Sequence, residues 1–443
     1  MSRTVITYGV FDQFHEGHRR LLERARALGD VLIVGVTTEE FAQERGKYTT
    51  ADSLETRMEN VRKTGLADQV IIEYGYGQKK EDILKFHVDV FAAGSDWTGK
   101  FDELTDICEV VYLERTPGIS SSDIRNRRHP EVKIGLVGNG RIAPRFMREA
   151  AFINGLTISG VYNPHKESAE RFAQMHNIRA YAEYEEMLET CDAVYVCTPQ
   201  ETHGEYVMKA LQAGRHVLCE KPMVLSGREA QELYALAKTQ DVILMEAMKT
   251  AYTPAFRKLL EVAHSGVIGE IYDIDAAFTR LTDPALREWS GPYGGSFAEV
   301  GSYVLLPVIK LYGTEFDEIR SWSVRNEEGK DSYTKMILRK GDRTATVRTG
   351  LGVKTEAQLI LSGTKGYILA EAPWWKSGKF EIRREDPEDR TAFVIPYHGD
   401  GMRYEIGEFM NMIEGHIREK SLFSPAESIC MAMIMERFFS SHD

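Results

Sequence analysis

The chain has 443 residues but few cysteines, and its charge is not predominantly positive. The cysteines lie far apart and form no CxxC pair, so we expect reduced thiols with a structural role, as in a cytoplasmic protein. We expect no metal ion held by protein side chains alone. The cysteines are Cys108, Cys191, Cys197, Cys219 and Cys430.

The net charge of -12 at pH 7 argues against a nucleic-acid partner, because binding a phosphate backbone requires clustered lysine and arginine. Local basic sites for small phosphates are compatible with that charge. No apolar run reaches the roughly 20 residues that a membrane-spanning helix needs. The first residues lead into a strand-like run without an apolar signal region. We therefore expect a cytoplasmic protein without a membrane span that acts on small molecules.

The length of the chain predicts two or three domains. In residues 1–128, strand and helix signals alternate as in a parallel sheet, and the polar, basic run NRRHP at 126–130 indicates a linker. A second alternating series occupies residues 131–250. From residue 251 to 443 the alternation of apolar and polar residues is typical of a largely antiparallel sheet.

The first domain is expected to contain strands at 4–10, 31–36, 69–73, 90–93 and 109–113, and helices at 18–28, 54–64 and 80–87. For the second we expect strands at 132–137, 157–162, 193–197, 216–219 and 242–246, and helices at 168–176 and 204–213. Strands of the third are expected at 271–278, 318–324, 333–338 and 344–349. The predicted fold class is α/β: a Rossmann-like parallel-sheet domain, a Rossmann dinucleotide-binding domain and a C-terminal α+β open-sheet domain.

The run HEGH at 15–18 follows the first predicted strand directly. His15 and His18 are three residues apart at the start of a helix, so they fall on one face. The helix N-terminus offers unpaired N–H groups, and Gly17 lets a phosphate approach the backbone. Such a group can stabilise charge on a phosphoryl group during transfer. Two solvated surface histidines are the alternative interpretation of a bare HxxH pair.

The run GVFDQFHEGH at 9–18 resembles the GxFDxxHxGH signature of the cytidylyltransferase family. The run RTPGISSS at 115–122 resembles that family's RTxGIST segment. The resemblance covers about residues 4–125 and is closest to the small glycerol-3-phosphate cytidylyltransferases. It implies a nucleotidyltransferase that uses CTP with Mg²⁺, the metal being bound mostly by the phosphates.

By this resemblance, His15 and His18 are the catalytic residues that contact the triphosphate. Ser95 and Pro117 depart from the family pattern, which bears on the choice of acceptor and not on the histidines. The remaining residues implied to bind CTP or phosphate are Gly9, Phe11, Asp12, Gly17, Lys47, Arg57, Asp96, Trp97, Arg115, Thr116, Ser120, Ser121 and Ser122. Each of the supporting residues has an alternative interpretation. Lys47 and Arg57 could be solvated surface charges, the serines could only cap a helix, and Trp97 could belong to the core.

A second nucleotide motif, GNGRIA at 138–143, follows the strand-like run 132–137. Gly138 permits a tight turn, Gly140 lets a pyrophosphate reach the backbone, and Ala143 allows the helix to pack on the strand. The acidic residue expected at the end of the next strand is missing, and YNPHK stands at 162–166. Since Asn163, His165 and Lys166 tolerate a 2′-phosphate, NADP(H) is favoured over NAD(H).

The runs TPQETH at 198–203 and CEKPM at 219–223 resemble the TPxxxH and EKP segments of the Gfo/Idh/MocA oxidoreductases. This resemblance extends from about residue 132 to the C-terminus. It implies that Lys221 is the catalytic lysine beside the nicotinamide and the substrate oxygen. The implied cofactor-binding residues are Gly138, Gly140, Arg141, Ile142, Asn163, His165, Lys166, Thr198, Pro199, His203, Glu220, Lys221 and Pro222.

The run GGSFAEVGSY at 294–303 resembles the family's GG…DxGxH segment, with Glu299 for aspartate and Tyr303 for histidine. A spacing of four places both on one helix face. The branch that resembles dihydrodiol dehydrogenases and glucose-fructose oxidoreductases also has tyrosine here, and EAM at 246–248 is similar to that branch. Glu299 and Tyr303 are thus predicted to be catalytic, with Tyr303 donating the proton. A buried, hydrogen-bonded tyrosine is the alternative.

Together the two motif sets predict a bifunctional enzyme that makes a CDP-activated polyol. One half would reduce a small carbonyl compound with NAD(P)H, and the other would transfer CMP to a polyol phosphate, with glycerol favoured and ribitol next. Two alternatives are open: a cytidylyltransferase with a non-catalytic nucleotide-binding or dimerising domain, and two halves that serve unrelated sugars. A homo-oligomer is expected by analogy, because open sheets of this family often pair.

Overall fold

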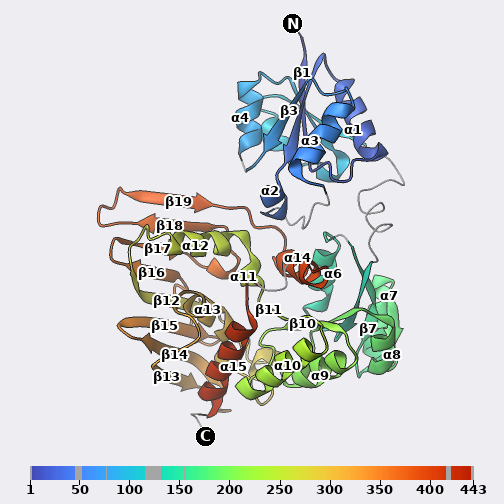
Figure 1. Cartoon of the computed structure of the whole chain (residues 1–443). Helices are drawn as coiled ribbons and strands as arrows, with labels where there is room; N and C mark the ends of the chain where they lie inside the picture. The colour runs from blue at the N-terminus through green and yellow to red at the C-terminus, as the bar shows by residue number, and fades with distance from the viewer. Residues whose placement is uncertain are drawn as a thin grey trace. The chain divides into compact units, whose positions relative to one another are not determined.

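The computed structural model describes residues 2–44, 52–75, 77–114, 131–153, 155–415 and 421–440 (Figure 1). The chain divides into two compact units, the first mainly Met1–Glu131 and the second mainly Val132–Ala151 with Leu156–Asp443. Among the described residues, no helix has the length and apolar character to cross a membrane.

In the described part of the first unit, five strands form a parallel sheet in the order β3-β2-β1-β4-β5. The strands are β1 Thr4–Gly9, β2 Val31–Thr37, β3 Gln69–Glu73, β4 Val90–Gly94 and β5 Glu109–Leu113. The helices are α1 Glu16–Arg26, α2 Glu39–Glu44, α3 Leu54–Lys63 and α4 Gln78–Lys85, with 3-10 turns η1 Ser95–Trp97 and η2 Asp102–Leu104. The strand order reverses between β1 and β4, which is where open α/β sheets bind ligands.

Alternating residues of the strands supply a core on each face of this sheet. Val5 and Val34 are buried against Leu22 of α1 on one face, and Ile6 and Phe91 are buried on the other. A parallel sheet covered on both faces requires such continuous apolar strands. The core therefore holds β1 in the centre of the sheet, and the residues that follow β1 begin at its carboxyl edge.

The second unit contains a parallel sheet whose described strands have the order β11-β10-β9-β6-β7-β8. The strands are β6 Val132–Val137, β7 Leu156–Tyr162, β8 Arg179–Tyr181, β9 Ala193–Val196, β10 His216–Glu220 and β11 Leu244–Ala247. The helices are α6 Ala143–Ala150, α7 Lys166–His176, α8 Tyr184–Thr190, α9 His203–Gln212 and α10 Gly227–Thr239, with the 3-10 turn η3 Gln200–Thr202. The switch point lies between β6 and β9.

The rest of this unit is built on an eight-stranded sheet, counted over the described residues, in the order β13-β14-β15-β12-β16-β17-β18-β19. β12 runs parallel to β15, and the other pairs are antiparallel. The strands are β12 Ile271–Thr279, β13 Glu318–Arg325, β14 Asp331–Lys340, β15 Arg343–Gly350, β16 Leu359–Gly363, β17 Gly366–Ala370, β18 Lys379–Arg383 and β19 Arg390–Val394. The helices are α11 Lys249–Tyr252, α12 Pro254–His264, α13 Ser296–Tyr312, α14 Met402–Ile413 and α15 Pro425–Ser440, with 3-10 turns η4 Arg287–Trp289 and η5 Trp374–Lys376.

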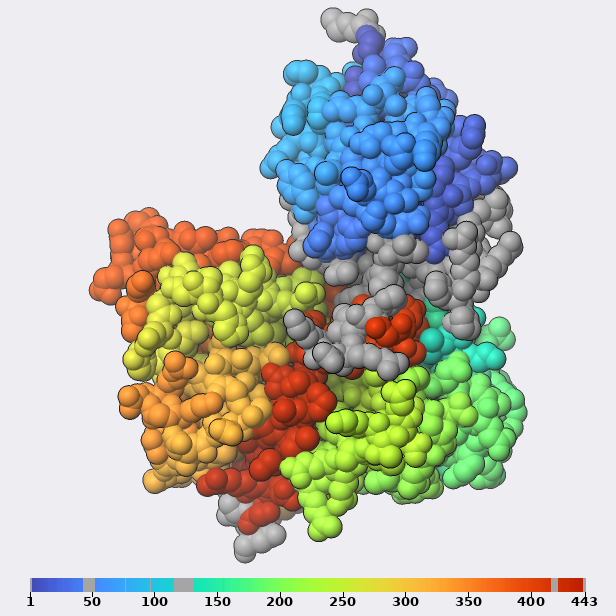
Figure 2. Space-filling view, viewed as in Figure 1, coloured from blue at the N-terminus to red at the C-terminus, as the bar shows by residue number. Residues whose placement is uncertain are grey.

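Helices α13 and α15 connect the eight-stranded sheet of the second unit to its Rossmann part. The largely apolar helix α13 packs on β12, β14 and β15, and α15 contacts both α13 and α10. Figure 2 shows the red surface of α15 between the orange strands and the green Rossmann helices. The site that forms between the Rossmann sheet and α13 is therefore fixed by packing within one unit.

The predicted fold class is confirmed, and the predicted strands appear within a few residues of their expected ends. The first helix begins at Glu16 and not at residue 18, because His15 is its N-cap. The structure adds elements that the sequence analysis did not assign, among them α2, β8 and the strands β16 to β19. Strands β16 to β19 have only five residues each, so the alternation of apolar residues is too brief to stand out.

A buried ion pair connects α6 to α14 within the second unit. The Arg403 guanidinium donates to Glu149 through Nε at 3.1 Å and Nη2 at 2.9 Å. Burial would raise the pKa of Glu149, but the hydrogen bonds and charge of Arg403 outweigh it and lower that pKa. The ion pair therefore stabilises the folded second unit at pH values above the ordinary glutamate pKa. This stabilisation is lost as the pH falls through the lowered pKa of Glu149.

We expect Arg403→Ala to reduce the free energy of unfolding of the second unit by about 3–5 kcal/mol, because it leaves a buried carboxylate unpaired. Urea unfolding followed by tryptophan fluorescence measures this, since four of the five tryptophans lie after residue 132. The control is Arg148→Ala, whose exposed pair with Asp400 spans 3.5 Å and should contribute about 0–1 kcal/mol. Equal losses in the two variants would contradict the expectation.

Candidate functional site

The loop between β1 and α1 in the first unit has a constrained backbone. Phe11 and Gln13 have positive φ angles of 53° and 45°. A Cβ atom on Gly9 would lie 3.0 Å from the ring of Phe11, so a larger residue there would require that ring to shift. Asp12 accepts from the N–H of Asp52 at 2.9 Å, and Asp52 accepts from the N–H of Gln13 at 3.0 Å. These reciprocal bonds fix the loop that leads to the histidines.

The two histidines lie side by side at the N-terminus of α1. The His15 Nδ1 accepts from the N–H of Gly17 at 3.0 Å, which makes His15 the N-cap. The rings of His15 and His18 stack with centroids 3.8 Å apart and an interplanar angle of 22°. Phe11 and Phe14 flank His18 at 5.4 and 5.5 Å. The arrangement presents two imidazoles beside the positive end of a helix, which suits an anionic phosphoryl group.

Arg57 supports this loop from below the surface. Its side chain is fully buried, donating from Nη1 to the carbonyls of Val10 at 2.8 Å and Thr37 at 2.6 Å. Its Nε donates to the Asp52 carbonyl at 3.0 Å, and its Nη2 lies 2.9 Å from Glu39. In this structure the guanidinium therefore connects the carboxyl ends of β1 and β2 to α3. Asp52, which the sequence analysis missed, belongs to no motif and is recognised only by these contacts.

Trp97 lies at the carboxyl end of β4, next to β1 at the switch point. It is the last residue of η1, and its ring centroid lies 5.8 Å from that of Phe101. The Lys100 ammonium lies 5.3 Å from the ring centroid of Trp97. The backbone of Asp96 belongs to the same turn. The predicted residues Lys47, Arg115, Thr116, Ser120, Ser121 and Ser122, and the side chain of Asp96, lie outside the described residues.

In the second unit, the glycine-rich loop has the geometry for a dinucleotide. Gly138 has a φ of +97°, and a Cβ atom there would lie 3.0 Å from the backbone of Cys197. Nothing lies within 4 Å of a Cβ atom built on Gly140, so that side of the loop is open. Arg141 and Ile142 precede α6, whose N-terminus can receive a phosphate. The residues present fit a pyrophosphate.

The end of β7 carries amides and not a carboxylate. Asn163 donates from Nδ2 to Asn139 Oδ1 at 2.6 Å and accepts from the N–H of His165 at 2.9 Å. The exposed Lys166 starts α7 and lies 3.4 Å from Glu183. This end of the loop therefore combines neutral hydrogen-bonding groups with an exposed cation.

His203 joins two of the predicted cofactor segments. It is 2% exposed, and its ring nitrogens each lie 3.0 Å from a carbonyl oxygen, of Pro222 and of Thr198. Burial lowers the pKa of His203. It thus holds the loop of Thr198 and Pro199 against the loop of Glu220 to Pro222. Glu220 accepts from the Tyr195 hydroxyl at 2.6 Å, and burial raises its pKa despite the charge of Lys221.

Lys221, Glu299 and Tyr303 line one cavity of about 600 Å³ with the glycine-rich loop. The Lys221 ammonium donates to the carbonyl oxygen of Glu299 at 2.9 Å and lies 5.3 Å from the ring centroid of Tyr303. Burial raises the pKa of Tyr303 well above its usual value, which keeps its hydroxyl protonated. The structure therefore brings the predicted lysine and tyrosine together beside the cofactor loop.

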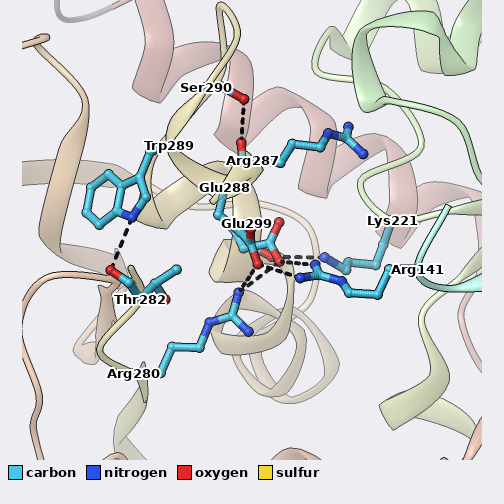
Figure 3. Close-up of polar contacts among 9 residues, drawn as sticks. All are labelled: Arg141, Lys221, Arg280, Thr282, Arg287, Glu288, Trp289, Ser290 and Glu299. Carbon is cyan, nitrogen blue, oxygen red and sulfur yellow. Dashed lines mark hydrogen bonds and ion pairs between the residues drawn. The ribbon is translucent and has the colours of Figure 1, made fainter. Parts of the chain in front are cut away.

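An ion-pair network that the sequence analysis missed crosses the same cavity (Figure 3). Glu288 lies 2.8 Å from Arg141 and 3.0 Å from Arg280, and Arg280 lies 3.2 Å from the Glu299 carboxylate. Burial would raise the pKa of Glu288, but the arginines lower it. Arg141 and Glu288 are 147 residues apart, so no local pattern could reveal the pairing.

Comparison with known proteins assigns both units. The cytidylyltransferase-like family model matches residues 6–127, and the model of an oxidoreductase family with an NAD-binding Rossmann fold matches residues 132–248. The chain is 50% identical over 125 residues to glycerol-3-phosphate cytidylyltransferase of Staphylococcus aureus, covering 28% of this chain and 92% of that protein.

The second unit has relatives of its own. Over 317 residues the chain is 28% identical to scyllo-inositol 2-dehydrogenase (NADP(+)) of Bacillus subtilis, covering 69% of this chain and 95% of that one. A 3-ketoreductase from Actinomadura kijaniata, solved with NADP and TDP-benzene, has the same fold with a TM-score of 0.62 at 23% identity, covering 69% and 96%.

The two matches are adjacent and do not overlap, and each coincides with one set of motifs. The predicted motif residues lie within these matches, with His15 and His18 in the first and Gly138 and Gly140 in the second. The chain is thus a bifunctional enzyme in which a domain of the cytidylyltransferase-like family is fused to an NAD(P)-dependent oxidoreductase of the Gfo/Idh/MocA family.

Proposed function

We propose that this enzyme makes a CDP-activated polyol by reducing a small phosphorylated carbonyl compound and then transferring CMP to the resulting polyol phosphate. The observation that carries the proposal is the presence, in one chain, of the stacked His15 and His18 at a helix N-terminus and of Lys221 with Tyr303 beside a glycine-rich loop. The acceptor of the transfer would be a phosphate monoester, so a reduction product that passes directly to the first unit would carry that phosphate already.

In the transfer step, an oxygen of the polyol phosphate attacks the α-phosphorus of CTP, and the bond to the β-phosphate breaks to release pyrophosphate. Charge grows on the phosphoryl oxygens, and His15, His18 and the N-terminus of α1 stabilise it. Arg57 positions the loop that carries these groups. Mg²⁺ would accompany CTP, bound mostly by its phosphates.

In the reductive step, the glycine-rich loop of Gly138 and Gly140 would hold the pyrophosphate of the cofactor. NADPH supplies the hydride when bound. Tyr303 gives its hydroxyl proton to the carbonyl oxygen as that oxygen becomes an alcohol. Lys221, held by the Glu299 carbonyl, positions the oxygen and favours its negative charge. The amides at the end of β7 and the exposed Lys166 support NADP(H) over NAD(H).

Glycerol is our first choice for the polyol, because glycerol-3-phosphate cytidylyltransferase of S. aureus shares half of its aligned residues with the first unit. Ribitol is the next candidate. Products of this kind serve the synthesis of teichoic-acid-like or capsular polymers.

We also propose a homo-oligomer, since Trp322 and Val324 on edge strand β13 are 56% and 57% exposed.

The two reactions should be separable by mutation. His18→Ala should lower pyrophosphate release by at least about 100-fold, as expected for loss of a transition-state contact, and leave NADPH oxidation unchanged. Lys221→Ala should lower NADPH oxidation and leave pyrophosphate release unchanged. Coupled assays for pyrophosphate and for absorbance at the nicotinamide band measure both. Loss of both activities in both variants would contradict independent sites, and absence of any NADPH oxidation in the unmodified enzyme would favour a non-catalytic second unit.

The acceptor can be identified directly. We expect pyrophosphate release from CTP and Mg²⁺ with one of glycerol-3-phosphate, glycerol-2-phosphate and ribitol-5-phosphate, because the histidine site requires only a phosphate oxygen as nucleophile. The ketone or aldehyde that corresponds to the active polyol should then oxidise NADPH. If that carbonyl compound is inert while an unrelated one is reduced, the two halves serve different sugars.

Cofactor preference depends on the loop after β7. Lys166→Glu places a negative charge near the expected 2′-phosphate, so kcat/KM for NADPH should fall by about 10-fold or more while the value for NADH changes little. Steady-state rates with the two cofactors measure this. The control is Lys238→Glu, an exposed lysine near the end of α10. Equal responses of the two variants would argue against a 2′-phosphate at this loop.

A further inference from the structure

Glu246 is the first residue of the run EAM at 246–248, to which the proposed reduction assigns no role. It lies on β11 beside Cys219 of β10 in the parallel register, and it is 3% exposed. It does not line the cavity that Lys221 and Tyr303 share. A buried carboxyl group must be stabilised by hydrogen bonds, because burying a charge is costly unless it is paired.

Both oxygens of Glu246 accept a hydrogen bond. Oε1 accepts from the N–H of Met223 at 3.0 Å, and Oε2 accepts from the Ser428 hydroxyl. Met223 is two residues after Lys221, whereas Ser428 belongs to α15 and is 182 positions from Glu246 in the chain. The carboxyl group therefore connects the loop that carries Lys221 to α15.

The Pro222–Met223 peptide group is held at both of its polar atoms. Its oxygen lies 3.0 Å from His203 Nδ1, and its N–H is the donor to Glu246. Because a peptide group is planar, fixing both atoms fixes the backbone that follows Lys221. The Lys221 ammonium then donates to the carbonyl oxygen of Glu299 at 2.9 Å. The place of this ammonium thus depends on a peptide group that two buried side chains hold.

The charge of Glu246 changes near neutral pH. Burial raises its pKa to about 7, although its two hydrogen bonds and the charge of Lys221 oppose this rise, and Glu220 adds to it. Cys219 of β10 and Tyr234 of α10 also face the carboxyl group, and burial together with the charge of Glu246 raises the pKa of each. Above its pKa, the negative carboxylate strengthens the bond from the loop and favours the Lys221 ammonium.

We propose that Glu246 is a positioning residue for Lys221: it holds the lysine in the cavity through the Pro222–Met223 peptide group and couples this position to α15 through Ser428. The inference rests on the proposed role of Lys221 in the reduction. It gives Glu246 no contact with substrate or cofactor. Since no residue of α15 lines the cavity, the reductase should respond to a change outside its own site.

The first test measures kcat with NADPH and a carbonyl compound that the unmodified enzyme reduces. Glu246→Gln keeps the size of the side chain and an acceptor for Met223, but it removes the charge. At pH 8 its kcat should be lower by about 5-fold or more, because a hydrogen bond to a charged acceptor is roughly twice as strong as one to a neutral acceptor. At pH 6, where the carboxyl group is mostly protonated, the two enzymes should differ little. KM for NADPH should change little. Equal kcat values at both pH values, or an equal loss at both, would overturn the proposal.

Ser428→Ala tests the coupling to α15. The hydrogen bond from Ser428 lowers the pKa of Glu246, so its removal should shift the midpoint of the pH dependence of kcat to higher pH. An unchanged midpoint would contradict the coupling.

Glu408→Gln is the matched control. Glu408 lies on α14, is 4% exposed and does not line the cavity, and burial raises its pKa as well. This variant should keep the kcat and the pH dependence of the unmodified enzyme. The same response in Glu408→Gln as in Glu246→Gln would show a general effect of buried carboxyl groups and would overturn the positioning role.

A second test follows Lys221 in the full-length enzyme without a carbonyl substrate. The rate at which acetic anhydride acetylates Lys221 at pH 8, measured by mass spectrometry, reports its free amine and its accessibility. Glu246→Gln should raise this rate by about 5-fold or more, whereas Glu408→Gln should not. If no carbonyl compound is reduced but the rate rises as expected, the proposed reduction fails and the positioning of Lys221 is supported. Equal acetylation rates in Glu246→Gln and the unmodified enzyme would refute the positioning itself.

Discussion

Hydrogen bonds between parallel strands align the carboxyl ends of β1 and β4 in the first unit and of β6, β9 and β10 in the second. Every loop that leaves such a sheet edge begins at the same level, so residues that are far apart in the chain meet there. The histidines follow β1, Trp97 follows β4, the glycine-rich loop follows β6, and Lys221 follows β10. The parallel register is thus the constraint on which both sites depend.

Charged groups that lack access to water support both sites, but in different ways. In the first unit the buried Arg57 is satisfied mainly by backbone carbonyls, so it fixes the loop without needing a ligand. In the second, the buried Glu288 is compensated by Arg141 and Arg280. Burying a charge is costly unless it is paired, so these partners allow Arg57 and Glu288 to be buried beside the two sites.

The proposed order of reactions follows from what each unit can do chemically. The reductase changes the oxidation state of one carbon and leaves a phosphate elsewhere in the molecule untouched. The transferase uses that phosphate and leaves the hydroxyl groups untouched. In the proposed sequence, a carbonyl compound with one phosphate would therefore serve both units.

Local patterns determined much of this protein. The alternation of strand and helix signals predicted most of the parallel strands. The runs at 9–18, 138–143 and 219–223 predicted the family of each half, because each motif occupies one turn between a strand and a helix. The eight-stranded sheet was only partly predicted, since β16 to β19 are short. Tertiary structure alone decided that Arg57 is buried, that Glu288 joins two arginines, and that Lys249 and Glu405 share a cavity with Lys221. These groups are separated by up to 184 positions in the chain (405 minus 221), so their contacts arise from packing between distant elements and leave no periodic signal in the sequence.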